Sequence, residues 1–546
     1  MNRFIIPASL CISLALTVLC PAAIPEVQDA LKSGSLSAYH GQVTEFINRR
    51  VAVHLSGNTK KSLQHLLDEP ALRRALAQRQ LIGKLGAARI DEFAKGGKTQ
   101  KAFLGSLLLN TPAMEHALEG ATPIGHSHRQ QDKWTIPISA LGIWHHLLNS
   151  DPDAQSGIYL KLALATGLNP PGTGNQGAGQ AKSPETPLAR YRFYKNSHQN
   201  GELFPSFDNL SVWEYRQIVS SNASNADLEW GRNAINTWRP DLRNNELVVN
   251  STSEVWRRNS PIPFNDTFKN VLAGGGKCGP RSSWSIFICQ AFGIPATGVR
   301  QPGHVCATYK SAYPDVQPQP GNIWKVVYGR GWHVSKACGI SGEEFMQEMS
   351  ARAHLAGFMR GERLRWLSAA MQSKSTSEKI MALAAVMPPL QAPDQPVTAR
   401  QRKASSATGS ITPPDPGTIR FDAVSFSTAN GIQVHDCFTG GKQVYNGKYA
   451  PGWGTPADIT WKVNVQSAGT YGLTLQAAVA NVEQTVLISI NGGNPVPVSI
   501  ANSHGLWQKT RSLDIAMKPG ENTINLTRPE TGRGLALRYL EVRKKS

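Results

Sequence analysis

One cysteine and one histidine have the residue types and the setting that acyl-transfer chemistry needs. Cys278 follows a run of three glycines, and His304 stands in a second glycine-marked segment further along the chain. A neutral imidazole can take the proton of a thiol, generate the thiolate nucleophile and later protonate a leaving amine. We therefore expect Cys278 to attack an amide carbonyl and His304 to move the proton, with backbone N–H groups around Lys277 and Cys278 holding the oxyanion.

The segments around this pair have the composition of elements that would position it. The apolar residues after Cys278 predict a buried helix, and a thiol at a helix N-terminus has its thiolate favoured by the helix dipole. Gly293, in GIPA, ends this helix, and Gly303 and His304 begin a strand-like segment, HVCATYK. The histidine is thus expected on a strand that follows the cysteine helix.

This order of motifs is similar to that of a known fold. GGGKCGPRSSW, a helix, GIPATGV and PGHVCATY together resemble the transglutaminase-like (papain-like) fold that transglutaminases, bacterial cysteine peptidases and peptide N-glycanases share. The resemblance covers residues 267–337 and implies an α+β domain. In it, Cys278 matches the family nucleophile and His304 the family base, and we expect no cofactor.

The third member of the family's catalytic triad does not carry over. An Asp or Asn on the strand after the histidine orients the imidazole in that family, but two alignments of NIWKVVYGRGWHVSKACG place there Tyr328 or Gly329, and Ser335 or Lys336. Asp315 lies in a Pro-rich loop, and His333 would be only a polar substitute. Loss of the orienting group typically lowers the rate by orders of magnitude without abolishing activity. A weakened enzyme and a domain without catalysis therefore both fit the sequence.

The remaining cysteines leave several pairings open. Beyond the N-terminal segment the cysteines are Cys278, Cys289, Cys306, Cys338 and Cys437. An odd number in an exported protein leaves at least one thiol unpaired or linked to another chain. We expect Cys289 to be inert packing, whereas Cys306 lies on the strand face of His304 and can reach either Cys278 or Cys338.

The N-terminal residues predict export. Residues 1–23 combine Arg3, a long apolar run and a small-residue end, which is the pattern of a secretory signal peptide. This predicts a secreted, periplasmic or cell-envelope protein. Leu19 stands where a lipid-attachment signal wants a small residue, which argues against lipidation of Cys20. No later run approaches ~20 apolar residues, so we expect no transmembrane span.

Length and charge limit the organisation and the partners. A chain of 546 residues exceeds a single core, so several domains are expected. The formal net charge of +19 would attract acidic glycans, envelope polymers or nucleic acid, and also fits a basic surface without a particular partner. Because no helix-turn-helix, zinc-ligand spacing or polybasic block is present, no specific nucleic-acid partner is expected.

Composition divides the chain into six segments. These are a signal peptide (1–23), a helical N-terminal region (24–166), a Gly/Pro-rich loop (167–187), the transglutaminase-like domain (188–387), a linker (388–417) and a C-terminal all-β jelly-roll sandwich (418–546). Ser341 and Glu344 have capping-box spacing and open the helical run that closes the middle domain.

The C-terminal segment resembles galactose-binding-like β-sandwiches, above all carbohydrate-binding modules. Those modules often hold calcium with acidic residues, but Val424 and Arg538 replace two of the three, so no metal is expected. Trp453, in APGWGTP, and Trp507, in HGLWQK, are the candidates for stacking on a sugar ring. Trp461 lies in strand sequence and is expected in the core.

Two hypotheses of different classes follow. The first is an exported cysteine hydrolase or acyltransferase that acts on amide bonds of envelope peptides, glycoproteins or peptidoglycan stems, with the sandwich binding polysaccharide. The second is a secreted glycan-binding or adhesion protein whose transglutaminase-like domain is a catalytically inactive scaffold. The missing Asp or Asn favours the second hypothesis, and the presence of both Cys278 and His304 favours the first. The sequence predicts no oligomeric state.

Overall fold

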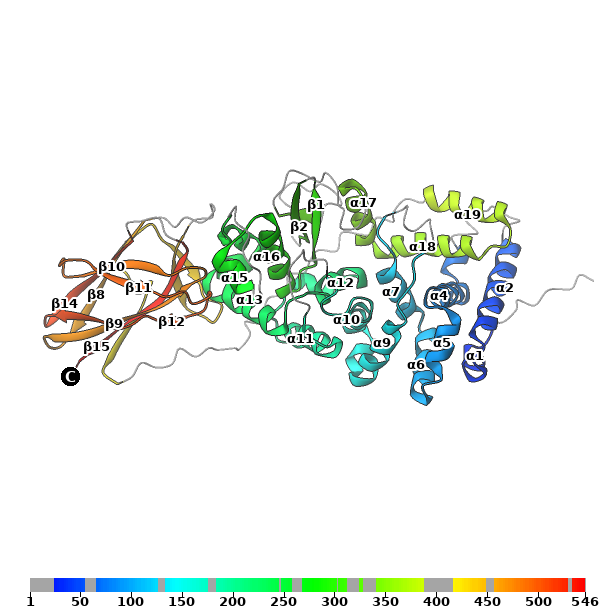
Figure 1. Cartoon of the computed structure of the whole chain (residues 1–546), viewed down its shortest axis with the longest axis horizontal. Helices are drawn as coiled ribbons and strands as arrows, with labels where there is room; N and C mark the ends of the chain where they lie inside the picture. The colour runs from blue at the N-terminus through cyan, green and yellow to red at the C-terminus, as the bar shows by residue number, and fades with distance from the viewer. Residues whose placement is uncertain are drawn as a thin grey trace, which may run out of the picture. The chain divides into compact units, whose positions relative to one another are not determined.

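The computed structural model describes residues 24–54, 65–125, 133–174, 183–244, 247–257, 268–301, 303–311, 324–327, 340–386, 416–447, 456–528 and 533–545 (Figure 1). The predicted signal peptide, with Cys20, lies outside these residues, as does nearly all of the predicted linker. Also outside them are Asp315, Tyr328, Gly329, His333, Ser335, Lys336, Cys338 and Trp453.

Over its described residues the chain forms two compact units. One comprises the part up to Met114 together with Arg360–Pro388, and the other comprises Glu115–Met359 and Pro389–Ser546. Residues 360–387, which composition assigns to the end of the middle domain, lie in the N-terminal unit. Within that unit Arg360 and Arg363 pair with Asp68 at 3.0 and 3.5 Å.

The first unit is helical, as predicted. Its helices are α1 (Val27–Ser33), α2 (Leu36–His54), α4 (Pro70–Leu85), α5 (Ala87–Ala94), α6 (Lys98–Leu109), most of α18 (Leu355–Ala370) and α19 (Lys374–Val386), and α7 (Thr111–Ala121) continues into the second unit. The apolar spacing that predicted these helices buries one face. In α4, for example, Leu72, Leu76 and Leu85 are buried.

The second unit begins with further helices. They are α9 (Ser139–Ser150), α10 (Gly157–Leu168), α11 (Pro187–Gln199), α12 (Val212–Val219), α13 (Asn225–Trp238), α14 (Pro240–Asn244), α15 (Phe268–Gly274), α16 (Cys278–Ala291) and α17 (Gly342–Ala353), with 3₁₀ turns η1 (Pro152–Gln155), η2 (Pro205–Asn209) and η3 (Val248–Glu254). The Ser341 side chain accepts a hydrogen bond from the Glu344 backbone N–H at 3.1 Å, so the predicted cap of α17 is confirmed.

A small antiparallel sheet follows α16. Among the described residues its strand order is β1 (Ala296–Gln301), β2 (His304–Lys310) and β3 (Trp324–Val326). In the β1–β2 hairpin Gln301 pairs with His304, and Val299 pairs with Cys306. Figure 1 shows α16 beside β1 and β2, so a helix and then a strand follow the glycine turn, as predicted.

The C-terminal region is a β-sandwich, as predicted. Its strands are β4 (Thr418–Asp422), β5 (Thr428–Asn430), β6 (Gln433–Asp436), β7 (Lys442–Asn446), β8 (Ala457–Val465), β9 (Gly469–Val479), β10 (Gln484–Ile490), β11 (Val496–Ile500), β12 (Gln508–Lys509), β13 (Leu513–Met517), β14 (Gly520–Arg528) and β15 (Leu535–Lys544). Over the described residues one sheet has the order β11-β10-β14-β8-β5, and the other has β12-β9-β15-β7-β6 with β13 on β9 and β4 on β15.

The alternation that predicted the strands also builds the sandwich core. Along β8 buried and more exposed residues alternate, which turns Trp461 inward, fully buried, with its Nε1 donating to the Ala423 carbonyl at 2.9 Å. Trp461 is therefore a core residue, as expected. Among the helices that the structure describes, none is long and apolar enough to cross a membrane.

Candidate cysteine site

The glycine turn places Cys278 at the start of a helix. Cys278 is the first residue of α16 and is half-buried. Gly275 has a φ of +71°, and a Cβ there would overlap the carbonyl oxygen of Trp256. The Gly276 N–H donates to that same oxygen at 2.7 Å. The turn is thus packed against the backbone at Trp256, which explains the glycine at position 275; a Cβ at Gly276 would instead overlap the Pro280 side chain.

Helix α16 packs against the strand that begins at His304. Ser282, one helical turn after Cys278, donates from its hydroxyl to the Val305 carbonyl at 3.1 Å. Burial, and next the charge of Cys278, raise the pKa of the Cys306 thiol to about 11, so Cys278 and Cys306 lie close enough to interact electrostatically. His304, half-buried, is the first residue of β2. The two predicted catalytic residues therefore lie on elements that pack together.

The other thiols have environments that suppress ionisation. Cys289 is completely buried in α16, and burial raises its pKa far above the ordinary value. Burial also raises the pKa of Cys437, in the sandwich, to about 11. The four cysteines that the structure describes, Cys278, Cys289, Cys306 and Cys437, carry free thiols. Cys338, the predicted alternative partner of Cys306, lies outside the described residues.

The position predicted for the orienting residue follows the third strand. Strand β3 pairs with β2 through Thr308 and Val326. The residues that the alignments place at the orienting position come after β3 and lie outside the described residues. No group of three or more His, Cys, Asp or Glu side chains that could hold a metal ion is found in the described part of the chain.

A segment that the sequence did not single out supports the cysteine helix. Trp284 of α16 donates from Nε1 to the Ser251 hydroxyl at 3.0 Å, and the hydroxyls of Thr252 and Ser285 lie 2.8 Å apart. All four side chains are buried or nearly so. The 3₁₀ turn η3 is thereby bonded to the side of α16. The sequence around η3, VVNSTSE, contains no recognised motif that would have predicted this role.

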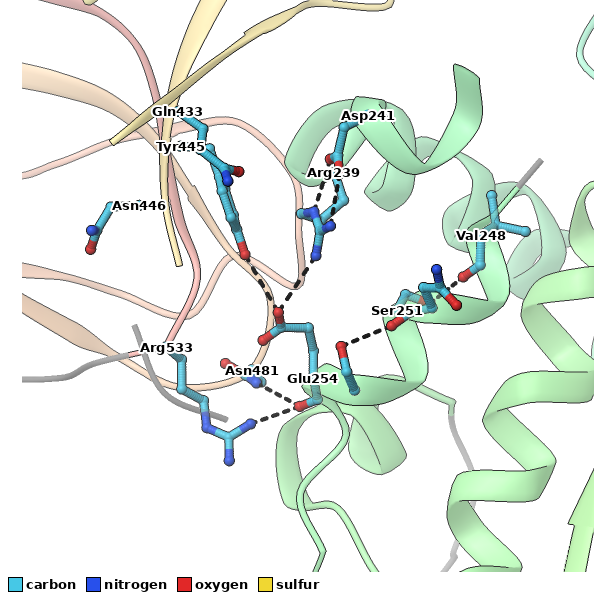
Figure 2. Close-up of polar contacts among 12 residues, drawn as sticks. Arg239, Asp241, Val248, Ser251, Glu254, Gln433, Tyr445, Asn446, Asn481 and Arg533 are labelled. Atoms are coloured by element: carbon cyan, nitrogen blue, oxygen red, sulfur yellow. Dashed lines mark hydrogen bonds and ion pairs between the residues drawn. The ribbon is translucent and has the colours of Figure 1, made fainter. Parts of the chain in front are cut away.

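The end of η3 is also bonded to the sandwich. The Glu254 carboxylate, 2% exposed, accepts a hydrogen bond from the Tyr445 hydroxyl at 3.4 Å and pairs with Arg239 at 3.6 Å (Figure 2). Its backbone carbonyl accepts from Asn481 at 3.1 Å and from Arg533 at 2.7 Å. Tyr445, Asn481 and Arg533 belong to the sandwich, so this end of the sandwich meets η3 through buried polar groups.

An ion pair on the helical side completes this network. Arg239 donates two hydrogen bonds to Asp241, at 2.8 and 2.7 Å, and His435 of the sandwich lies 3.3 Å from the same carboxylate. Burial alone would raise the pKa of Asp241, but the hydrogen bonds from Arg239 and the nearby His435 ring outweigh it and hold that pKa well below its usual range. Burial raises the pKa of Glu254.

Of the two tryptophans predicted to bind sugar, the structure describes Trp507. It is half-buried and directly precedes β12. In the same loop the His504 carbonyl accepts from Trp230 Nε1 at 3.1 Å, and a Cβ on Gly505 would lie 2.9 Å from Ala234 Cβ. The loop that carries Trp507 is thus packed against α13. Trp453 lies outside the described residues.

Comparison with known proteins returns carbohydrate-binding modules. No protein-family model and no curated protein matches the sequence. Among solved structures, a family 35 carbohydrate-binding module from Clostridium thermocellum is 20% identical, covers 23% of this chain and 98% of that one, and has a TM-score of 0.20. The C-terminal CBM6 of LamC from Zobellia galactanivorans is 18% identical over 23% of this chain and 99% of that one, with a TM-score of 0.19.

A larger enzyme is matched over a part of its length. The GH26-CBM35 β-(1,4)-mannanase of Podospora anserina is 16% identical over 24% of this chain, with a TM-score of 0.20, and the chain spans only 28% of that enzyme. The sandwich is established by its own strand order.

Proposed function

We propose that this chain is a transglutaminase-like cysteine hydrolase or acyltransferase that acts on amide bonds. The observation that carries the proposal is the placement of Cys278 at the N-terminus of α16, a helix that packs against the strand beginning at His304. A thiol at that end of a helix has its thiolate favoured by the helix dipole. A histidine on the facing strand is suited to exchange a proton with it.

The reaction follows from these two groups. His304 takes the thiol proton, and the sulfur of Cys278 forms a bond to the amide carbonyl carbon. Backbone N–H groups at the start of α16 hold the resulting oxyanion. The carbon–nitrogen bond then breaks, and His304 returns its proton to the leaving amine, which leaves a thioester on Cys278. Water or a second amine then attacks the thioester carbonyl carbon, and His304 takes a proton from it as base. The carbon–sulfur bond breaks, and His304 returns the proton to the departing sulfur of Cys278, which releases a carboxylic acid (hydrolysis) or a new amide (acyl transfer).

The proposed substrates are peptides, glycoproteins or peptidoglycan stems of the cell envelope, because the N-terminal sequence predicts export. The proposed role of the sandwich is to bind polysaccharide through Trp453 or Trp507. The +19 net charge would favour acidic envelope polymers.

The competing proposal is a secreted glycan-binding or adhesion protein with an inactive transglutaminase-like scaffold. It is favoured by one observation: the aligned sequence places Tyr328, Gly329, Ser335 or Lys336 where an orienting Asp or Asn is expected. None of these side chains is a carboxylate that could hold an imidazolium in place.

Alkylation of Cys278 as a function of pH separates the two proposals. In an activated pair the rate with iodoacetamide is already high near neutral pH, because the histidine stabilises the thiolate. His304→Gln should therefore lower the rate at about pH 7 by roughly tenfold or more and move the profile toward that of an ordinary thiol. His65→Gln, at an exposed position of the N-terminal unit, is the matched control. Identical profiles for the native chain and His304→Gln would refute the enzyme and favour the scaffold.

A further inference from the structure

Arg533 of the sandwich contacts Glu254, the last residue of η3, and Trp256, two residues further along the chain. Its Nη1 donates to the Glu254 carbonyl at 2.7 Å, and its guanidinium lies 3.6 Å from the centre of the Trp256 ring. The side chain is buried. An arginine stacked at this distance holds the ring by cation–π attraction and by contact area. The position of the Trp256 ring is thus set in part by the sandwich.

The sandwich in turn fixes Arg533. The Arg533 backbone N–H donates to Gln484 Oε1 at 3.1 Å, and its carbonyl accepts a hydrogen bond from Arg528. Arg528 also donates to Gln484 and to Asn446, which lie on strands β10 and β7. These buried hydrogen bonds tie the residue to the ends of the strands. Arg533 is therefore a fixed part of the sandwich.

Trp256 contacts the glycine turn that immediately precedes the proposed nucleophile, Cys278. Its carbonyl oxygen accepts the hydrogen bond from Gly276, and Gly275 packs so closely on Trp256 that a Cβ would overlap it. Arg257 and Gly276 form a parallel β-bridge. Gly276 is separated from Cys278 by Lys277 alone. Any displacement of Trp256 must therefore displace the turn that sets the position of the thiol.

We propose that Arg533 is a positioning residue for Cys278, acting through Trp256 and the glycine turn. This inference rests on the proposed function. The Glu254 network, shown in Figure 2, gives the sandwich one docking geometry on η3. Arg533 transmits that geometry to the turn through Trp256. The sandwich is then an integral part of the cysteine site, in addition to any polysaccharide that it binds.

The test uses the full-length chain and measures alkylation of Cys278 by iodoacetamide over a range of pH. Arg533→Ala removes both contacts and should lower the rate near neutral pH by about ten- to a hundredfold, the cost expected for misplacing a reacting group by ~1 Å. Arg533→Lys keeps the charge and a donor but loses the planar stack, so it should recover only part of the rate. Lys545→Ala removes an exposed ion pair with Asp514 on the same sandwich and should change nothing.

The outcomes separate this inference from the proposed function. If His304→Gln changes the profile and folded Arg533→Ala does not, the positioning role is wrong and the catalytic pair stands. If His304→Gln has no effect, the proposed function is wrong and the positioning role falls with it. Should Arg533→Ala fail to fold, Arg533→Lys decides, because a native profile for that variant would overturn the inference.

Discussion

Selective alkylation of one thiol is the sharpest expectation from the structure. Burial raises the pKa of Cys306 and of Cys437 to about 11 each. At pH 7 such a thiol is ionised in about one molecule in ten thousand, whereas an ordinary thiol with a pKa of about 8.5 is ionised in about three in a hundred. The thiolate populations therefore differ by about 300-fold.

The difference in reaction rate is smaller than the difference in thiolate population, because the two kinds of thiolate differ in intrinsic nucleophilicity. A thiolate of higher pKa is intrinsically more reactive, and with a Brønsted slope of about 0.4–0.5 a difference of about 2.5 pKa units returns a factor of roughly ten to twenty. An accessible thiol of merely ordinary reactivity should thus react about 15- to 30-fold faster than Cys306 or Cys437. Limited access of the reagent to these two buried side chains widens the gap. Under the proposed function, activation of Cys278 by His304 would widen it further.

The assay treats the folded, full-length chain with limiting iodoacetamide and reads each cysteine-containing peptide by mass spectrometry. Cys278 should be labelled first. The rates at Cys306 and Cys437 should rise about tenfold for each pH unit between about 7 and 9, because both thiols remain far below their pKa there. A sample labelled in denaturant should show nearly equal rates at all sites. Labelling of Cys306 or Cys437 as fast as Cys278 in the folded chain would refute the reasoning.

Two further predictions concern the sandwich and its junction. If the sandwich binds polysaccharide, Trp507→Ala or Trp453→Ala should weaken retention on it without lowering the melting temperature; retention that ignores both changes and disappears at about 1 M salt would instead be electrostatic. Because Asp241 has a lowered pKa in the folded chain, its contribution to stability is present above its unfolded pKa of about 3.9 and is lost as pH falls toward the lower folded value. Asp241→Asn should therefore flatten the fall in melting temperature between about pH 5 and 2, and a variant as acid-sensitive as the native chain would contradict this.

Sequence patterns were sufficient to predict those helices, strands and caps whose formation depends on residues within the same segment. The apolar run after Cys278 buries one helix, α16, and the residues from His304 form a strand because the glycine before them allows a tight hairpin turn. The Ser341 cap was visible because its partner, Glu344, is three residues away. The strands of the sandwich were predictable for the same reason, since alternation along each strand already identifies the buried face.

Contacts between distant residues were beyond such patterns. Asp68 pairs with Arg360 and Arg363, which lie 292 and 295 residues further along the chain in the same compact unit. Glu254 and Arg533 meet although most of the chain's second half separates them. Neither lies in a motif, and a buried Glu cannot be recognised from sequence because acidic residues are usually exposed. The support for the cysteine turn therefore became visible only in the structure.

The chemical nature of the junction bears on what the sandwich does. A purely apolar contact of the same size would hold two parts together at least as well, because burying charged groups such as Glu254 and Arg239 costs desolvation that their pairing only partly returns. What a buried polar network adds is a requirement for one geometry, since a small shift breaks the hydrogen bonds and ion pairs that it makes. A sandwich whose only role is to bring a glycan near an enzyme does not have to dock in one fixed geometry. A sandwich that sets the position of the Cys278 turn through Arg533 and Trp256 does.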